Sequence, residues 1–185
     1  MIGNLLSDLQ HHVSSLRGSL RGAWKLWRVW CDSELPARAP LLDRSTVLAL
    51  RYCMMTWDFP EAAVLTCIAF HGFLRTSEYI NLRVSQVIFD RLVTQAHLQF
   101  PESKGAARRG VVESVHITDA QLIKLLRKCM AGKQMSDNIL PQTPAQYREL
   151  FALACHALSL DTEFKPYSLR RGGATELRHA QHGSM

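Results

Sequence analysis

The longest apolar stretch of the sequence, residues 62–73, places the strongest constraint on the fold. It has about half the length that a membrane-spanning helix needs, so we expect a helix buried in a globular core. Arg75 and Glu78 follow directly and bring a cation and an anion to the end of this buried element. We expect a junction between two helices here, with Thr76 or Ser77 capping the second helix. Arg75 can then point into a cleft while Glu78 supports it, although a plain polar break between helices has the same pattern.

Apolar residues at helical spacing predict further helices along the chain. The expected helices cover residues 4–17, 20–31, 45–57 with a cap at Ser45 or Thr46, 60–75, 77–82, 119–129 and 144–158, with a last one beginning near Tyr167. Pro36 and Pro40 interrupt the pattern after the second helix. We therefore expect a helical N-terminal segment over residues 1–35, a linker over 36–44 and a second domain over 45–185.

Between residues 84 and 117 the pattern changes to short runs that are rich in β-branched residues. Three antiparallel strands are expected over residues 84–89, 92–100 and 111–117. A short turn at Asp90 and Arg91 separates the first two strands, and a longer polar loop separates the last two. The sequence thus predicts an α+β fold that is mostly α-helical and has a small three-stranded antiparallel sheet.

Basic residues outnumber acidic ones by 22 to 16, which gives a formal net charge of +6. The basic residues occur in clusters, and local density is what phosphate binding requires. The clusters are Arg17, Arg21, Lys25 and Arg28; Lys104, Arg108 and Arg109; Lys124, Arg127, Lys128 and Lys133; and Lys165, Arg170, Arg171 and Arg178. This distribution is compatible with a polyanionic partner but does not establish one.

The five cysteines form no pattern that is typical of a disulfide framework or a metal site. No two of them have the C-x-x-C spacing, and four lie in apolar or amphipathic helical contexts. We expect free thiols in a reducing, intracellular compartment, with no metal and no cofactor. The N-terminus lacks a basic segment followed by an apolar core, so we expect no signal peptide and no membrane partner.

Two arginine motifs stand on either side of the expected sheet. The first is Leu-Arg-Thr-Ser-Glu-Tyr-Ile-Asn-Leu at residues 74–82, and the second is Tyr-Ser-Leu-Arg at 167–170, followed by Arg-Gly-Gly. In this order, with a sheet and a basic helix between them, they resemble the two arginine boxes of the tyrosine recombinases, the phage-integrase family of DNA strand-exchange enzymes. The resemblance extends from about residue 45 to the C-terminus and implies the fold of that family's catalytic domain. Residues 1–35 would then correspond to a remnant of the preceding DNA-clamping domain.

The resemblance assigns roles to individual residues. Arg75 and Arg170 match the two arginines that hold the non-bridging oxygens of the scissile phosphate, a task suited to paired donors with a permanent charge. Lys104 matches the general acid that protonates the leaving 5′-oxygen. Tyr167 stands where the family has a histidine, and its phenol can donate a hydrogen bond but is a poor base near neutral pH.

Other residues are expected to assist these four. Glu78 would hold Arg75 in position, and Arg108, Arg109 and Arg171 would contact the DNA backbone. The implied partners are double-stranded DNA and other protomers bound to it, in a nucleus or nucleoid.

One departure from the family concerns the nucleophile. The family has a tyrosine several tens of residues beyond the second motif, whereas this sequence continues for fifteen residues after Arg170 and contains no tyrosine there. We therefore expect a C-terminally truncated domain from a recombination or integration enzyme of a mobile element, inactive by itself. A non-catalytic DNA-binding module is an alternative. A helical protein-interaction domain that uses Trp24, Trp27 and Trp30 is another, although their spacing favours packing within the protein.

Overall fold

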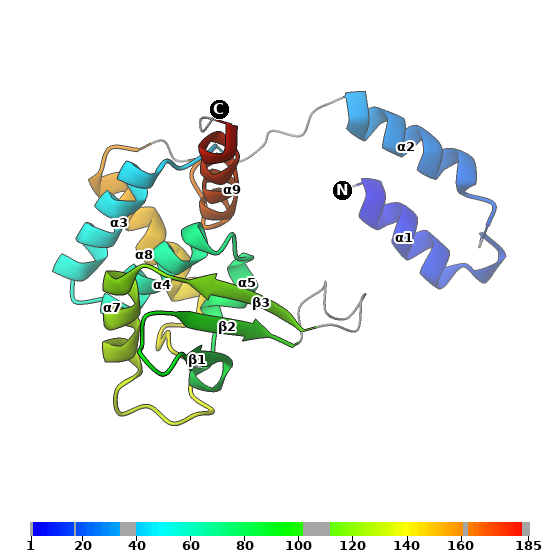
Figure 1. Cartoon of the computed structure of the whole chain (residues 1–185). Helices are drawn as coiled ribbons and strands as arrows, with labels where there is room; N and C mark the ends of the chain where they lie inside the picture. The colour runs from blue at the N-terminus through cyan, green and yellow to red at the C-terminus, as the bar shows by residue number, and fades with distance from the viewer. Residues whose placement is uncertain (1, 17, 34–39, 102–111, 161–162, 183–185) are drawn as a thin grey trace. The chain divides into compact units, whose positions relative to one another are not determined.

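The computed structural model describes residues 2–16, 18–33, 40–101, 112–160 and 163–182. Contacts divide the chain into two compact units, Met1–Arg38 and Ala39–Met185. The first unit is helical, and the second combines helices with a sheet (Figure 1).

The first unit is built from a pair of helices. It contains α1 (Ile2–His12), the short 3-10 turn η1 (Ser14–Leu16) and α2 (Arg21–Ser33). Trp24 ties α2 to α1, because its Nε1 donates a hydrogen bond to Oε1 of Gln10 at 3.0 Å. The rings of Trp24 and Trp27 meet edge to face, with centroids 5.4 Å apart. These two tryptophans therefore make contacts within the unit.

Helix α4 forms the centre of the second unit. The helices of this unit are α3 (Arg44–Thr56), α4 (Pro60–His71), α5 (Thr76–Ile80), α7 (Ala120–Met130), α8 (Pro144–Ala157) and α9 (Tyr167–His182). Every residue of α4 from Ala62 to Phe70 is buried, and α4 contacts α3, α5, α7 and α9. The apolar run is thus a core helix, as predicted. Among the described helices, none is both long enough and apolar enough to cross a membrane.

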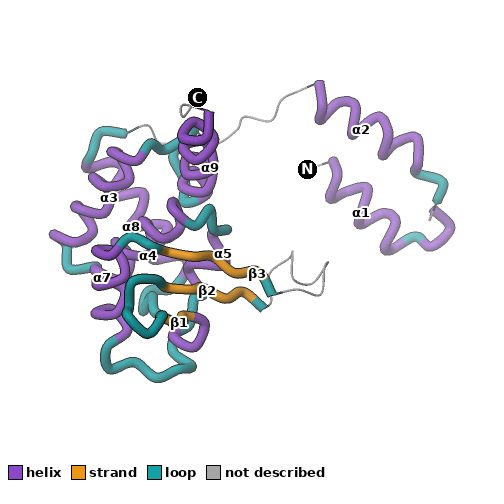
Figure 2. The backbone as a smooth tube through the Cα atoms, viewed as in Figure 1, coloured by secondary structure: helices purple, strands orange, loops and turns teal. Residues whose placement is uncertain are grey.

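A three-stranded antiparallel sheet accompanies these helices (Figure 2). Its strands are β1 (Val87–Phe89), β2 (Ala96–Phe100) and β3 (Glu113–Ile117), in the order β1-β2-β3. Ala96, Leu98 and Phe100 of β2 are buried, whereas His97 and Gln99 between them are not. This alternation places one face of the sheet on the core. The predicted fold class, mostly α-helical with a small antiparallel sheet, is confirmed.

The strands are shorter than the sequence predicts. Residues Val84–Gln86 form the 3-10 turn η2, so β1 begins at Val87. The carboxylate of Asp90 accepts hydrogen bonds from the backbone nitrogens of Thr94 and Gln95, at 2.7 and 2.8 Å. These bonds close residues 90–95 into a turn that delays the start of β2.

Two helix boundaries also differ from the prediction. Helix α3 is capped by Asp43 instead of Ser45 or Thr46, because its carboxylate accepts a hydrogen bond from the backbone nitrogen of Thr46 at 2.7 Å. Helix α4 ends at His71, because Phe73 adopts a left-handed conformation with a φ of 51°. The charged motif therefore follows a tight turn and does not continue the buried helix.

Candidate functional site

Arg75 lies at the first helix junction and is held there by Glu78. It is the N-cap residue of α5, so the cap lies one residue before Thr76 and two before Ser77, the two positions that the sequence suggested. Its backbone nitrogen donates to Oε2 of Glu78 at 2.7 Å, and its guanidinium Nη1 donates to Oε1 of the same carboxylate at 2.5 Å. One carboxylate thus contacts both the backbone and the side chain of Arg75. The supporting role of Glu78 toward a bound ligand stays a prediction.

A second carboxylate reaches the same guanidinium from the sheet. Oε2 of Glu113, the first residue of β3, lies 3.4 Å from Nη1 of Arg75. The hydrogen bond and charge of Glu78, and more weakly those of Glu113, raise the pKa of Arg75, which therefore keeps its proton at any relevant pH. This contact has no signal in the sequence, because strand register and tertiary packing bring Glu113 to the junction.

The end of α4 touches the sheet directly. A Cβ atom on Gly72 would lie 2.9 Å from Cγ1 of Val115, which is on the inner face of β3. Gly72 thus allows the sheet to approach the turn that leads to Arg75, and Glu113 lies on the same strand two residues from Val115. The glycine therefore helps to set the contact between the two charged residues.

A pair of glycines in α9 lies against the segment before α3 and the end of α4. A Cβ atom on Gly172 would overlap the backbone carbonyl of Leu42, and one on Gly173 would overlap that of Phe70 and approach the ring of Phe73 at 3.0 Å. Two consecutive glycines inside a helix cost stability, by about 1 kcal/mol each relative to alanine. Their use here is explained by the backbone contact that they allow.

This contact brings the helix that carries Arg170 to the turn before Arg75. Arg170 precedes Gly173 by three residues, so both lie on the same face of α9, one helical turn apart. Gly173 on that face lies against Phe70 and Phe73, which precede Arg75 by five and two residues. Arg170 is half-buried, in keeping with this location. We call residues 70–75 together with 170–173 the α4–α9 junction.

Of the remaining predicted site residues, some lie on α9 and the others lie outside the described residues. Tyr167 begins α9, two turns before Gly173 along the helix, and is 51% exposed. Arg171 is half-buried on α9. Lys104, Arg108 and Arg109 lie outside the described residues. The structure thus brings the helix of Arg170 to the turn that carries Arg75, and the roles of all these residues stay predictions.

His71 ends α4 at this junction and is a packed residue. Its ring meets that of Phe70 edge to face, with centroids 5.6 Å apart. Burial, followed by the charge of Arg44, lowers the pKa of His71, while the carboxylates of Asp119 and Glu176 act weakly in the opposite direction. His71 is therefore poorly suited to hold a proton in the folded protein.

Two of the four tyrosines are sealed in the core. The side chains of Tyr79 and Tyr147 are fully buried and stack edge to face, and the hydroxyl groups of Tyr147 and Thr66 form a hydrogen bond of 2.8 Å. Burial raises the pKa of Tyr147 to about 12 and that of Tyr79 well above its usual range. Neither phenol can act as a nucleophile toward a bound phosphate. Tyr52 and Tyr167 are the exposed tyrosines.

A second basic region lies on α7. Lys124, Arg127 and Lys128 line a groove of about 400 Å³ together with Val93 of the β1–β2 turn. All three cations are exposed, and in the described part of the chain none of them forms an ion pair. We call these three residues the α7 basic face. They can attract a polyanion, but no ion pair with a described residue fixes their direction.

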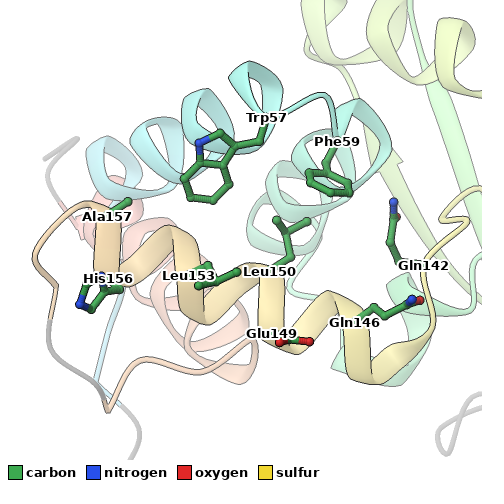
Figure 3. Close-up of a pocket in the computed structure, with 9 residues that line it drawn as sticks. All are labelled: Trp57, Phe59, Gln142, Gln146, Glu149, Leu150, Leu153, His156 and Ala157. Carbon is green, nitrogen blue, oxygen red and sulfur yellow. The ribbon is translucent and has the colours of Figure 1, made fainter.

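Another groove among the described residues is apolar. It has a volume of about 630 Å³ and lies between α8 and the turn from α3 to α4. Figure 3 shows Trp57 and Phe59 facing Leu150 and Leu153 of α8 across it. Glu149 is its charged lining residue, so this groove does not suit a phosphate group.

The sequence matches no protein-family model and no curated protein sequence. Its fold does match solved structures of recombinases. A pre-cleavage complex of the XerH site-specific recombinase with its difH substrate superposes with a TM-score of 0.60 at 14% identity, covering 78% of this chain and 45% of that chain. XerA recombinase superposes with a TM-score of 0.58 at 13% identity, covering 79% and 52%. The chain therefore has a tyrosine-recombinase-like fold and spans about half the length of the structures that it matches.

Proposed function

We propose that this chain is a DNA-binding domain of the tyrosine-recombinase type, in which Arg75 and Arg170 hold one backbone phosphate. The observation that carries the proposal is the backbone contact of α9 with the end of α4, which brings the helix of Arg170 to the turn before Arg75. The fold shared with site-specific recombinases supports the same reading. The proposed partner is double-stranded DNA, the substrate class of such enzymes.

The chemistry of the two arginines suits a phosphodiester. Each guanidinium offers several N–H donors in a rigid plane, and two of them can bind the two non-bridging oxygens. In the described residues, the hydrogen bonds of the Arg75 guanidinium run through Nη1 to carboxylates on one side. Its other nitrogens can then be directed at a ligand. Glu78 is a positioning residue in this scheme, since it acts through Arg75.

The other predicted residues complete the proposed interface. Tyr167 is exposed in the first turn of α9 and can donate a hydrogen bond to a phosphate oxygen. Lys104 would take the position of the family's general acid, and Arg108, Arg109 and Arg171 would contact neighbouring phosphates. The α7 basic face can add non-specific attraction to the DNA backbone.

We further propose that the chain holds the phosphate without cleaving the strand through a tyrosine of its own. Two of its four tyrosines are buried with raised pKa values, and Tyr167 occupies the position of the family's histidine. A nicked duplex that traps covalent recombinase intermediates tests this point. We expect no covalent protein–DNA adduct with this chain, and an adduct that disappears in a Tyr52→Phe or Tyr167→Phe variant would contradict the proposal.

Fluorescence anisotropy of a labelled duplex in a salt series tests the binding function itself. Each neutralised phosphate contributes about −0.9 to the slope of log affinity against log salt concentration. We expect a steep negative slope that becomes shallower by about 1 in Arg75→Ala and in Arg170→Ala. Arg148→Ala, which removes an exposed arginine from α8, is the matched control and should leave binding unchanged. Binding that is absent or independent of salt would contradict the proposal.

A further inference from the structure

The outer face of the sheet carries two histidines that lie directly opposite each other. His97 of β2 and His116 of β3 are register partners, and their ring centroids are 4.2 Å apart with an interplanar angle of 71°. His97 is half-buried and His116 is exposed. Both are therefore reachable from solvent while the two strands keep their separation fixed.

The spacing of the two rings suits a shared metal ion. A ligating imidazole nitrogen lies about 2.0–2.1 Å from a zinc ion, which places two such nitrogens roughly 3 Å apart in a tetrahedral site. In the edge-to-face arrangement one ring presents its edge to the face of the other, so both side chains must rotate before a nitrogen of each ring points at one ion. The exposed His116 can change rotamer with little steric restriction, and the half-buried His97 keeps part of its freedom. The paired strands supply the preorganisation that a two-ligand site needs.

The surrounding residues narrow the kind of ion. The described outer face of the sheet consists of Ile88, His97, Gln99, Ser114 and His116, and it carries no carboxylate. Calcium and magnesium prefer several oxygen ligands with negative charge, so this face does not suit them. Neutral imidazoles suit zinc, nickel and copper. In the described part of the chain no group of three or more His, Cys, Asp or Glu residues could hold a metal, so water would complete the coordination.

An aromatic contact alone would also place the two rings together, and cross-strand ring pairs contribute roughly 0.2–1 kcal/mol. The two explanations make different predictions. An aromatic contact does not involve the ring nitrogens, whereas a metal site requires a nitrogen from each of the two imidazoles.

We propose that His97 and His116 form a two-imidazole site for a borderline divalent transition-metal ion that links β2 to β3. The argument for this site does not rest on the proposed DNA-binding function. Because the ion would bind the folded hairpin better than the unfolded chain, it would stabilise the second unit by mass action. Its effect would be concentrated on the pairing of these two strands.

Calorimetric titration of the tag-free chain with nickel and with zinc chloride tests this site. We expect one saturable site per chain, reversed by EDTA, whose affinity falls about tenfold or more in either His97→Ala or His116→Ala, because one imidazole alone cannot chelate. The control is a His11→Ala, His12→Ala double variant. These two rings also lie close, at 5.2 Å, but consecutive helical residues do not share a face. The control should bind as the unchanged chain does.

A measurement on the unchanged chain guards against misfolded variants. Paramagnetic nickel should selectively broaden the imidazole NMR signals of His97 and His116 before those of the other histidines. Equal broadening of all histidines, no saturable binding, or full affinity in both single variants would overturn the proposal.

Discussion

The two basic regions of the second unit differ in how their charges are held. At the α4–α9 junction, the Arg75 guanidinium contacts two carboxylates. Two glycines of α9, Gly172 and Gly173, bring this helix into backbone contact with Leu42 and Phe70. On the α7 basic face, three exposed cations line an open groove, and none of them has an ion-pair partner among the described residues. A restricted guanidinium can direct its donors at a phosphate at a low entropic cost, whereas a mobile cation supplies mainly charge.

The largest effect is expected from closing the space that the glycine pair leaves. Gly173→Ala places a methyl group on the carbonyl of Phe70, so α9 must move away from α4. Overpacking of this kind costs about 1–3 kcal/mol of the free energy of unfolding. Denaturant unfolding should show this loss, and DNA binding should weaken because Arg170 moves with α9. Gly22→Ala, where a Cβ atom meets nothing within 4 Å, is the control and should not destabilise the chain.

The next prediction compares Arg75, whose guanidinium is held by carboxylates, with an exposed arginine of the α7 basic face. Arg75→Lys keeps the charge but loses the planar fork, and we expect duplex binding to weaken about 10- to 100-fold, which corresponds to the roughly 1.5–3 kcal/mol of a charged hydrogen bond. Arg127→Lys on the α7 basic face should change binding by less than about twofold. Anisotropy measurements at one salt concentration suffice. Equal losses at the two positions would remove the distinction between the regions.

A smaller effect of opposite sign is expected at Glu113. Its carboxylate lies 3.4 Å from the Arg75 guanidinium and would repel an incoming phosphate. Partly exposed ion pairs of this kind contribute about 0.2–1 kcal/mol, so Glu113→Gln should tighten duplex binding by up to about fivefold. Glu78→Gln should instead weaken binding, because it disturbs both hydrogen bonds that position Arg75. The same sign in both variants would contradict the roles assigned to the two carboxylates.

The smallest effect concerns pH. The pKa of His71 is lowered in the folded chain, first by burial, so the unfolded chain binds a proton more readily. Stability that is present above the unfolded pKa of about 6.5 is therefore lost as the pH falls through it and toward the folded value. His71→Gln should flatten this part of the profile of thermal midpoint against pH. An unchanged slope would contradict the packed, neutral state of His71.

Local sequence patterns predicted much of the fold and the part of the candidate site that contains Arg75 and Glu78. The apolar run predicted the core helix, and Arg75 with Glu78 predicted a charged helix junction, because both depend on residues close in sequence. The predicted N-cap of α5 and the predicted end of α4 were wrong by one to four residues. The reason is that Phe73, in a left-handed conformation, ends α4 early. Backbone conformations of this kind have no dependable signal in a non-glycine residue.

Two features of the candidate site depend on long-range packing and could not be predicted from the sequence. The approach of α9 to Leu42 and Phe70 depends on tertiary contacts across more than half of the chain, and the arrival of Glu113 depends on strand register. The two consecutive glycines were a sequence signal for the close approach of α9, because glycine destabilises a helix interior unless close packing requires it. His97 and His116 gave no such signal, since only the register shows that they are opposite each other.

The central claim is that Arg75 and Arg170 act on the same phosphate, and a double-mutant cycle on duplex binding tests it most directly. Affinity is measured for the unchanged chain, Arg75→Ala, Arg170→Ala and the double variant. Residues that share one ligand couple by about 0.5–3 kcal/mol. We expect each single variant to lose most of what the double variant loses. Losses that simply add, or binding that survives both substitutions, would contradict the claim.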